Sequence, residues 1–149
     1  MVIELRRIGS DNRAECEQLS VRDEQKQYIA SNKDSLTEAE NNSDVARTFA
    51  IYADGRMVGF TMFAFDGYNE DPEDKYWLWR FMIDKNEQGK GFGKAALAEI
   101  IRYFREHNAD IITLSTKETN SAALGLYHRF GFSENGKMND DEIILKLCL

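Results

Sequence analysis

Three glycines at alternate positions near the middle of the chain constrain its fold more than any other feature. Residues 88–94 read Gln-Gly-Lys-Gly-Phe-Gly-Lys, and they lie between an apolar, aromatic stretch at 76–83 and an amphipathic stretch at 90–107. We therefore predict that a strand leads into a helix here. Because glycine has no Cβ, backbone N–H groups can converge on one point and a ligand can approach closely. The helix dipole is positive at the same place, so the expected ligand is an anion such as phosphate.

Two common phosphate-binding loops are excluded by the flanking residues. A Walker A loop requires glycine five residues before its Gly-Lys pair and Ser or Thr after it, but Gln88 and Ala95 occupy these places. Residues 91–96 fit the dinucleotide pattern G-x-G-x-x-A. That site also needs glycines directly after the strand and an acid at the end of the next strand. Here residues 84–87 intervene, and Asp110 precedes the next strand instead of ending it.

The glycines also fit Q-x-x-G-x-G, with Gln88, Gly91 and Gly93 at the fixed places. This motif resembles the acetyl-CoA signature of the GNAT superfamily of N-acetyltransferases. Residues 120–132 resemble the second signature of that family, N-x-x-A-x-x-L-Y-x-x-x-G-F. Both motifs come in the family's order and spacing. By this resemblance the chain is identified as a single GNAT domain over residues 1–149 that uses acetyl-CoA and no metal.

The resemblance implies a role for each part of the two motifs. Backbone amides of the glycine loop would hold the pyrophosphate of coenzyme A, and main chain around Met82 would pair with the pantetheine arm. One N–H there would face the thioester oxygen, and Asn120 would hydrogen-bond the arm. By its position Asn120 is also expected to cap the last helix, and the two roles can coexist. The cofactor-binding residues implied in this way are Phe81, Met82, Ile83, Gln88, Gly89, Lys90, Gly91, Phe92, Gly93, Lys94 and Asn120.

Tyr127 is the candidate catalytic residue. The resemblance places it beside the thioester sulfur, where it would act as the general acid. A phenol with a pKa near 10 stays protonated at neutral pH and can protonate a departing thiolate. The alternative is that Tyr127 is a core aromatic, because it lies on the apolar stripe formed by Ala123, Leu126, Tyr127 and Phe130.

Composition restricts the partners of the chain. The formal net charge of −7 repels nucleic acid and anionic membranes and attracts cations, although an acidic balance also serves solubility alone. No apolar run is long enough for a membrane span, and no signal peptide is recognisable, so we expect a cytoplasmic protein. Cys16 and Cys148 have no metal-ligand spacing and are expected to be reduced thiols, with a bridge between them left open.

Periodicity and turn signals predict an α/β (α+β) fold, and the pair Asp54-Gly55 between two strand-like segments predicts a hairpin. Strands at both ends surround a central β-α-β-α unit, which implies a mixed sheet with helices on both faces. With the resemblance, this is a mostly antiparallel sheet of about seven strands and about four helices. Expected strands are 2–8, 48–53, 56–65, 76–83, 111–115, 132–135 and 143–149. Expected helical segments follow Asp11 or Asn12 and cover 21–30, 36–40, 90–107 and 120–130. In 90–107 the spacing i, i+3, i+4, i+7 of Leu97, Ile100, Ile101 and Phe104 predicts one face buried in the core. The apolar strand at 76–83 is expected to be buried on both faces.

The identity of the acceptor amine rests on a narrower resemblance. Residues 27–31, 35–39, 58–60, 80–84 and 88–91 together resemble bacterial spermine/spermidine acetyltransferases. The acceptor implied is a polyamine, and a polycation also suits an acidic chain. The resemblance also implies a homodimer. Two alternatives remain: an acetyltransferase for a protein N-terminus or lysine, and a non-catalytic CoA-binding module.

Carboxylates that could receive the acceptor are less clear from the sequence. Asp66, Glu70 and Asp84, within or after the acidic loop 66–74, are candidates by position for contacting the acceptor and for removing its proton. A water relay to bulk solvent is the alternative for the proton. Polyamine acetyltransferases often have an acid on the central strand, but Trp79 and Arg80 occupy that stretch here. The ammonium groups of a polyamine would then need carboxylates elsewhere, and either tryptophan at 77 or 79 could add a cation–π contact.

Overall fold

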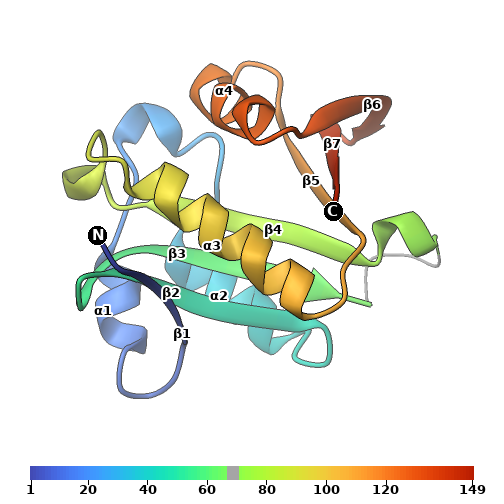
Figure 1. The fold of residues 1–149 in the computed structure, drawn as a ribbon. Helices are drawn as coiled ribbons and strands as arrows, with labels where there is room; N and C mark the ends of the chain where they lie inside the picture. The colour runs from blue at the N-terminus through green and yellow to red at the C-terminus, as the bar shows by residue number, and fades with distance from the viewer. Residues whose placement is uncertain (67–70) are drawn as a thin grey trace.

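The computed structural model of the protein describes residues 1–66 and 71–149. Seven strands form one sheet in the order β1-β2-β3-β4-β5-β7-β6. Neighbouring strands are antiparallel except β4 and β5, which are parallel, so the expected mixed, mostly antiparallel sheet is confirmed (Figure 1). The strands are β1 Ile3–Arg7, β2 Ala46–Ala53, β3 Arg56–Phe65, β4 Tyr76–Ile83, β5 Ile111–Lys117, β6 Ser133–Asn139 and β7 Glu142–Cys148.

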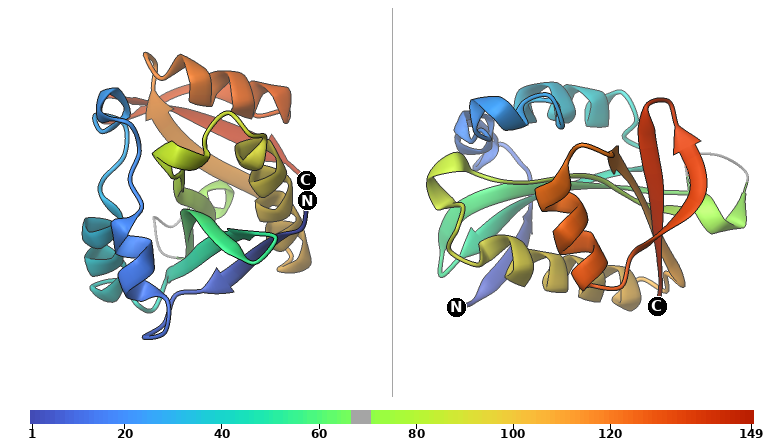
Figure 2. Two further views of the ribbon diagram at one scale, coloured as in Figure 1. Left: turned by 90° about the vertical axis from the view of Figure 1, so that its left-hand side faces the viewer. Right: turned by 90° about the horizontal axis from the view of Figure 1, so that it is seen from above.

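Four α-helices cover the two faces of this sheet. They are α1 Arg13–Gln18, α2 Asn32–Glu40, α3 Phe92–Glu106 and α4 Ser121–Arg129. Short 3-10 turns lie at η1 Asp23–Gln25, η2 Pro72–Asp74 and η3 Lys85–Glu87. Figure 2 shows α1 and α2 on one face and α3 and α4 on the other.

The predicted apolar stripe of α3 forms the centre of the larger core. Leu97, Ile100 and Phe104 are completely buried, and they pack with β3 and β5 residues in one cluster that also includes Tyr127 of α4. On the opposite face, α1 and α2 contribute Cys16 and Leu36 to a second cluster. The i, i+3, i+7 spacing of α3 was therefore a reliable guide to its buried face.

The hairpin prediction is also confirmed, for a local reason. Asp54 and Gly55 connect β2 to β3, and both have positive φ, at 50° and 84°. A two-residue turn with both central residues in this region has the twist that joins antiparallel strands.

The segment between α1 and α2 corrects the sequence-based prediction. Residues 21–30 were expected to be helical, but only the three-residue turn η1 forms there. The α2 helix begins four residues earlier than the expected 36–40, at Asn32, because the Ser31 hydroxyl accepts a hydrogen bond from the Asp34 N–H at 3.1 Å and caps the helix. Apart from η1, residues 19–31 therefore form an irregular segment between α1 and α2.

The central strand β4 also departs from expectation, in its burial and in its pairing. Trp79, Arg80, Phe81 and Ile83 are only half-buried, so burial on both faces was wrong for the second half of the strand. A β-bulge places Arg80 opposite Met62 and Leu78 opposite Phe63, which leaves Trp79 as the extra residue. Within the described residues, β4 pairs with β5 only at Trp77 and Thr113, and the two strands then diverge (Figure 1).

Both cysteines are free, one buried and one exposed. Burial of Cys16 between α1 and the sheet raises the pKa of its thiol from 9.0 to about 12, and the nearby charges of Glu17 and Glu15 act in the same direction. None of the helices in residues 1–66 and 71–149 is long and apolar enough to cross a membrane.

The buried thiol of Cys16 predicts a loss of stability at high pH. The folded state holds this proton more tightly than the unfolded state, so stability falls as the pH rises from 9 towards 12. By pH 11 the contribution of Cys16 to this loss is about 3 kcal/mol. We expect denaturant unfolding of Cys16→Ala to show a smaller loss between pH 8 and pH 11 than the unmodified protein. Cys148→Ala, at an exposed thiol, should change nothing, and equal losses in all three proteins would contradict the assignment.

Candidate active site

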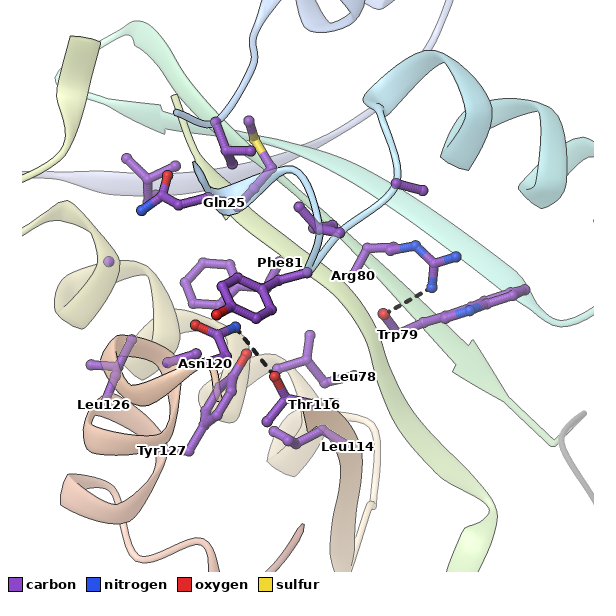
Figure 3. Close-up of a pocket in the computed structure, with 18 of the residues that line it drawn as sticks. Gln25, Leu78, Trp79, Arg80, Phe81, Leu114, Thr116, Asn120, Leu126 and Tyr127 are labelled. Carbon is purple, nitrogen blue, oxygen red and sulfur yellow. Dashed lines mark hydrogen bonds between the residues drawn. The ribbon is translucent and has the colours of Figure 1, made fainter. Parts of the chain in front are cut away.

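A cavity of about 800 Å³ opens where β4 and β5 diverge. Its walls come from the second half of β4, the end of β5, the first turns of α3 and α4, and the irregular segment between α1 and α2. Figure 3 shows Tyr127 and Asn120 on one side of this space, Phe81 near its middle, and Trp79 and Arg80 on another side. The cavity therefore borders both motifs found in the sequence, the glycine loop and residues 120–132.

The glycine loop has the backbone geometry of an anion site. Gly89 and Gly91 have φ values of +78° and +87°, a region that favours glycine. Gly91 is the N-cap of α3, and no side chain in this fully described loop caps the helix. The first N–H groups of a fifteen-residue helix are thus left for a ligand, with the helix dipole behind them. Gly89 and Gly93 also line the cavity.

Gln88 anchors the loop through its side chain. Its amide N–H group donates to the carbonyl oxygen of Ile83 at 3.0 Å and to Oε1 of Gln25 at 2.9 Å. Gln25 donates back to Oε1 of Gln88 at 3.1 Å. This pair of amides joins the irregular segment before α2 to the start of the glycine loop. The function of Gln88 that the structure shows directly is therefore to hold the loop in place.

The edge of β4 that faces the cavity is open. Phe81, Met82 and Ile83 all line the cavity, beyond the single β4–β5 pair. Their side chains alternate: Met82 packs with the α1–α2 cluster, whereas Phe81 and Ile83 pack towards α3. The Thr61 hydroxyl donates to the Arg80 carbonyl at 2.8 Å and fixes the bulge. An extended ligand can pair with such an edge as a further strand would.

Asn120 and Tyr127 of the second motif meet at the cavity wall (Figure 3). Asn120 occupies the N-cap position of α4, but its side chain makes no cap and instead donates to the Thr116 hydroxyl at 3.2 Å. The predicted side-chain cap is therefore wrong. Tyr127 is 9% exposed and packs edge-on against Phe132, with ring centroids 5.6 Å apart. Burial raises the pKa of its hydroxyl above the usual value of 10.0.

The sequence allowed Tyr127 to be either a core aromatic or a residue of the reaction site, and the structure is compatible with both. Tyr127 belongs to the main core cluster, and it also lines the cavity. A tyrosine in this position stays protonated through the neutral range, so it can donate a proton to an atom held in the cavity.

Comparison with known proteins identifies the family. Residues 11–132 match the acetyltransferase (GNAT) family profile. The chain belongs to the GNAT family. It is 38% identical over 151 aligned residues to the probable spermine N(1)-acetyltransferase of Bacillus subtilis subsp. natto, a match that covers 98% of this chain and 99% of that protein. It is 37% identical, with the same coverage, to the spermine/spermidine N(1)-acetyltransferase of Bacillus subtilis strain 168.

Solved GNAT structures share the fold. The spermidine N-acetyltransferase from Vibrio cholerae, solved with CoA and spermine, superposes with a TM-score of 0.75 at 19% identity and covers 98% of this chain and 95% of its own. As a GNAT enzyme, this protein is an acetyl-CoA-dependent N-acetyltransferase. The site fits the co-substrate: a backbone anion site lies at one end, and an open strand edge runs along a long cavity. No group of side chains suited to a metal ion is found among the described residues.

Arg80 lines the cavity, but its guanidinium is held by residues of α2 and β4. Its guanidinium donates to Glu38 of α2 at 2.8 Å and to the Trp79 carbonyl at 3.2 Å, pointing away from Tyr127 (Figure 3). Burial lowers the pKa of Arg80, while the charges of Glu38 and Glu142 oppose that effect. Its Nε has no hydrogen-bond partner among the described residues. The positive charge of Arg80 is thus paired with the carboxylate of Glu38 in α2, and its guanidinium does not point towards Tyr127.

The acidic candidates from the sequence are not brought together in the cavity. Asp66 is exposed and pairs with Lys75 at 3.3 Å, and Glu70 lies outside the described residues. Asp84 is buried, but its carboxylate accepts from the N–H groups of Ser20 and Asn86. Asp84 therefore caps η3 and ties β4 to the segment after α1, because both oxygens are used by backbone.

Three cavity residues were missed by the sequence reasoning. Gln25 meets Gln88 across 63 positions, and the Tyr28 hydroxyl donates to the Thr119 carbonyl across 91 positions at 3.1 Å. Glu142, at the start of β7, also lines the cavity. Tyr28 lies in residues 27–31 of the narrower resemblance, but nothing in the sequence gave any of the three a place at the site, since each reaches the cavity only through contacts with distant segments.

Proposed function

We propose that this GNAT enzyme transfers the acetyl group of acetyl-CoA to a primary amine of a polyamine such as spermidine or spermine. The observation that carries the proposal is the 37–38% identity, over nearly the full length of both chains, to proteins named as spermine or spermidine acetyltransferases. The net charge of −7 supports it, since a negative field raises the local concentration of a polycation.

In the proposed reaction both substrates occupy the cavity together. The glycine loop holds the pyrophosphate, and the open edge of Phe81, Met82 and Ile83 pairs with the pantetheine arm. A main-chain N–H on this edge, that of Met82, polarises the thioester carbonyl. The neutral amine attacks the carbonyl carbon, the C–N bond forms and the C–S bond breaks. Asn120 hydrogen-bonds the pantetheine arm beside the helix that carries Tyr127.

We assign Tyr127 as the proton donor to the departing sulfur. Its raised pKa keeps the hydroxyl protonated until the C–S bond breaks, when its proton passes to the sulfur and the phenolate is reprotonated from water. The proton released by the amine passes to water. The edge-on packing against Phe132 fixes the ring, so the hydroxyl keeps one direction within the cavity.

The acceptor class is tested by a thiol-release assay over a panel of amines. We expect kcat/KM for spermidine and spermine to exceed that for butylamine by about tenfold or more, because each additional ammonium–carboxylate hydrogen bond contributes about 1.5 kcal/mol or more. Amino acids, aminoglycosides and short peptides with free N-termini or lysines complete the panel.

The panel also separates the alternatives. A peptide that outperforms every polyamine would replace the proposal with protein acetylation. Tight CoA binding without turnover of any amine would favour a non-catalytic module.

A further inference from the structure

The charges that line the cavity are almost all neutralised by neighbours. Only four charged side chains line it among the described residues, namely Lys26, Arg80, Glu87 and Glu142. Three of them have a partner of opposite charge within 4 Å. These pairs are Lys26 with Asp23 at 2.9 Å, Arg80 with Glu38 at 2.8 Å, and Glu87 with Arg56 and, at 3.4 Å, Lys90.

Glu142 is the exception. It is half-buried at the start of β7, and it makes no ion pair with a lysine or arginine in residues 1–66 or 71–149. Its Oε1 accepts a hydrogen bond from the Ser115 hydroxyl at 2.8 Å, and Ser115 lines the cavity beside it. One hydrogen bond from a neutral hydroxyl orients the carboxylate, and Arg80, the charged group that interacts with it, forms its ion pair with Glu38 instead.

The half-buried carboxylate of Glu142 can therefore bind a cation that enters the cavity. In a half-buried place its attraction to an ammonium group is screened less than at the surface, and a charge-assisted hydrogen bond is stronger than a neutral one. Arg80 does not fill this role. Burial lowers the pKa of Arg80 and the charge of Glu142 opposes this effect, but the hydrogen bonds of Arg80 go to Glu38 and to the Trp79 carbonyl.

We propose that Glu142 binds a non-reacting ammonium group of the acceptor, and so selects amines that carry a second positive charge. This assignment rests on the proposed polyamine acceptor. It supplies the carboxylate that the central strand lacks, since Trp79 and Arg80 occupy the stretch of β4 where an acid was sought. Ser115 serves as the positioning residue, because its hydroxyl holds the Glu142 side chain at the cavity wall.

The test compares Glu142→Gln with Asp141→Asn. Both changes remove one negative charge at adjacent positions, but the side chain of Asp141 is exposed, pairs with Lys117 and does not line the cavity. For Glu142→Gln we expect KM for spermidine to rise ten- to a hundredfold. We expect kcat to change less than about threefold, and KM for butylamine to change as little. Asp141→Asn should behave as the unmodified enzyme does with both amines. Glu142→Asp, which keeps the charge on a shorter side chain, should give an intermediate KM for spermidine.

Three results would overturn the assignment. The first is the same KM for spermidine in Glu142→Gln and Asp141→Asn, with the unmodified enzyme active on spermidine; the proposed function would then survive alone. The second is an equal rise of KM for spermidine and butylamine, which would mean that the substitution disturbs the cavity in general. The third is absence of spermidine turnover in the unmodified enzyme, which would remove the proposed function together with the role of Glu142. CoA affinity, measured by calorimetry, shows that each variant is folded.

Discussion

Replacement of Gly91 by aspartate is expected to abolish CoA binding while the protein still folds. Gly91 is the N-cap of α3, where the free backbone N–H groups converge, and a carboxylate there would repel the pyrophosphate at short distance. We expect the CoA dissociation constant to rise by about a hundredfold or more, equivalent to about 2.7 kcal/mol. Isothermal titration calorimetry with CoA measures the change directly. A Cβ at Gly91 meets only the Met1 side chain at 4.0 Å, so no clash prevents folding.

Gly136→Asp provides the matched control for this experiment. Gly136 lies in β6 with φ +81°, close to the +87° of Gly91, and a Cβ there meets nothing within 4 Å. The two variants therefore share the backbone strain and the added charge, and they differ in distance from the anion site. If both variants bind CoA equally well, the assignment of the loop is wrong.

Removal of the Tyr127 hydroxyl is expected to have the second large effect. Tyr127→Phe keeps the ring packed on Phe132 but removes the proton donor, so kcat should fall by about 10²- to 10⁴-fold. The CoA dissociation constant should change little, because the phenyl ring still closes the cavity wall. Steady-state kinetics and calorimetry on the same preparation separate the two quantities.

Tyr103→Phe is the control for loss of a tyrosine hydroxyl. Tyr103 lies on α3, stacks on His107 with centroids 3.9 Å apart and does not line the cavity, so its kcat should match that of the unmodified enzyme. The pH profile gives a further check. Since burial raises the pKa of Tyr127, its deprotonation should not lower kcat below pH 10. Full activity in Tyr127→Phe would refute the acid assignment.

Local signals in the sequence predicted much of the fold. The alternate glycines predicted a strand-to-helix junction with bare backbone, and the structure has this junction, with positive φ at Gly89 and Gly91. The spacing of the apolar residues in α3 predicted its buried face, and the Asp54-Gly55 pair predicted the β2–β3 hairpin. These features depend on backbone conformation and periodicity over a few residues, which the sequence displays directly.

The same local reasoning failed where a longer-range contact decided the outcome. Residues 21–30 do not form a helix, because they cross the cavity and their side chains bond with distant residues, as in the Gln25–Gln88 pair. Asp84 was a candidate for the acceptor site, but backbone N–H groups of Ser20 and Asn86 occupy its carboxylate. Asn120 was expected to cap α4, but its side chain bonds Thr116 instead.

The sequence by itself determined the family, the anion loop and the candidate acid Tyr127, because each depends on a short run of residues of particular types. Only the tertiary structure decided which charged side chains line the cavity and which of them have a partner of opposite charge. Arg80 forms an ion pair with Glu38 from α2, and Glu142 of β7 forms none with a lysine or arginine in the part of the chain that the structure describes. Such pairings join residues that are far apart in the chain, and they depend on the divergence of β4 and β5 and on the packing of every layer around it. The proposed acceptor preference therefore depends on contacts between distant residues, which no short motif in the sequence marks.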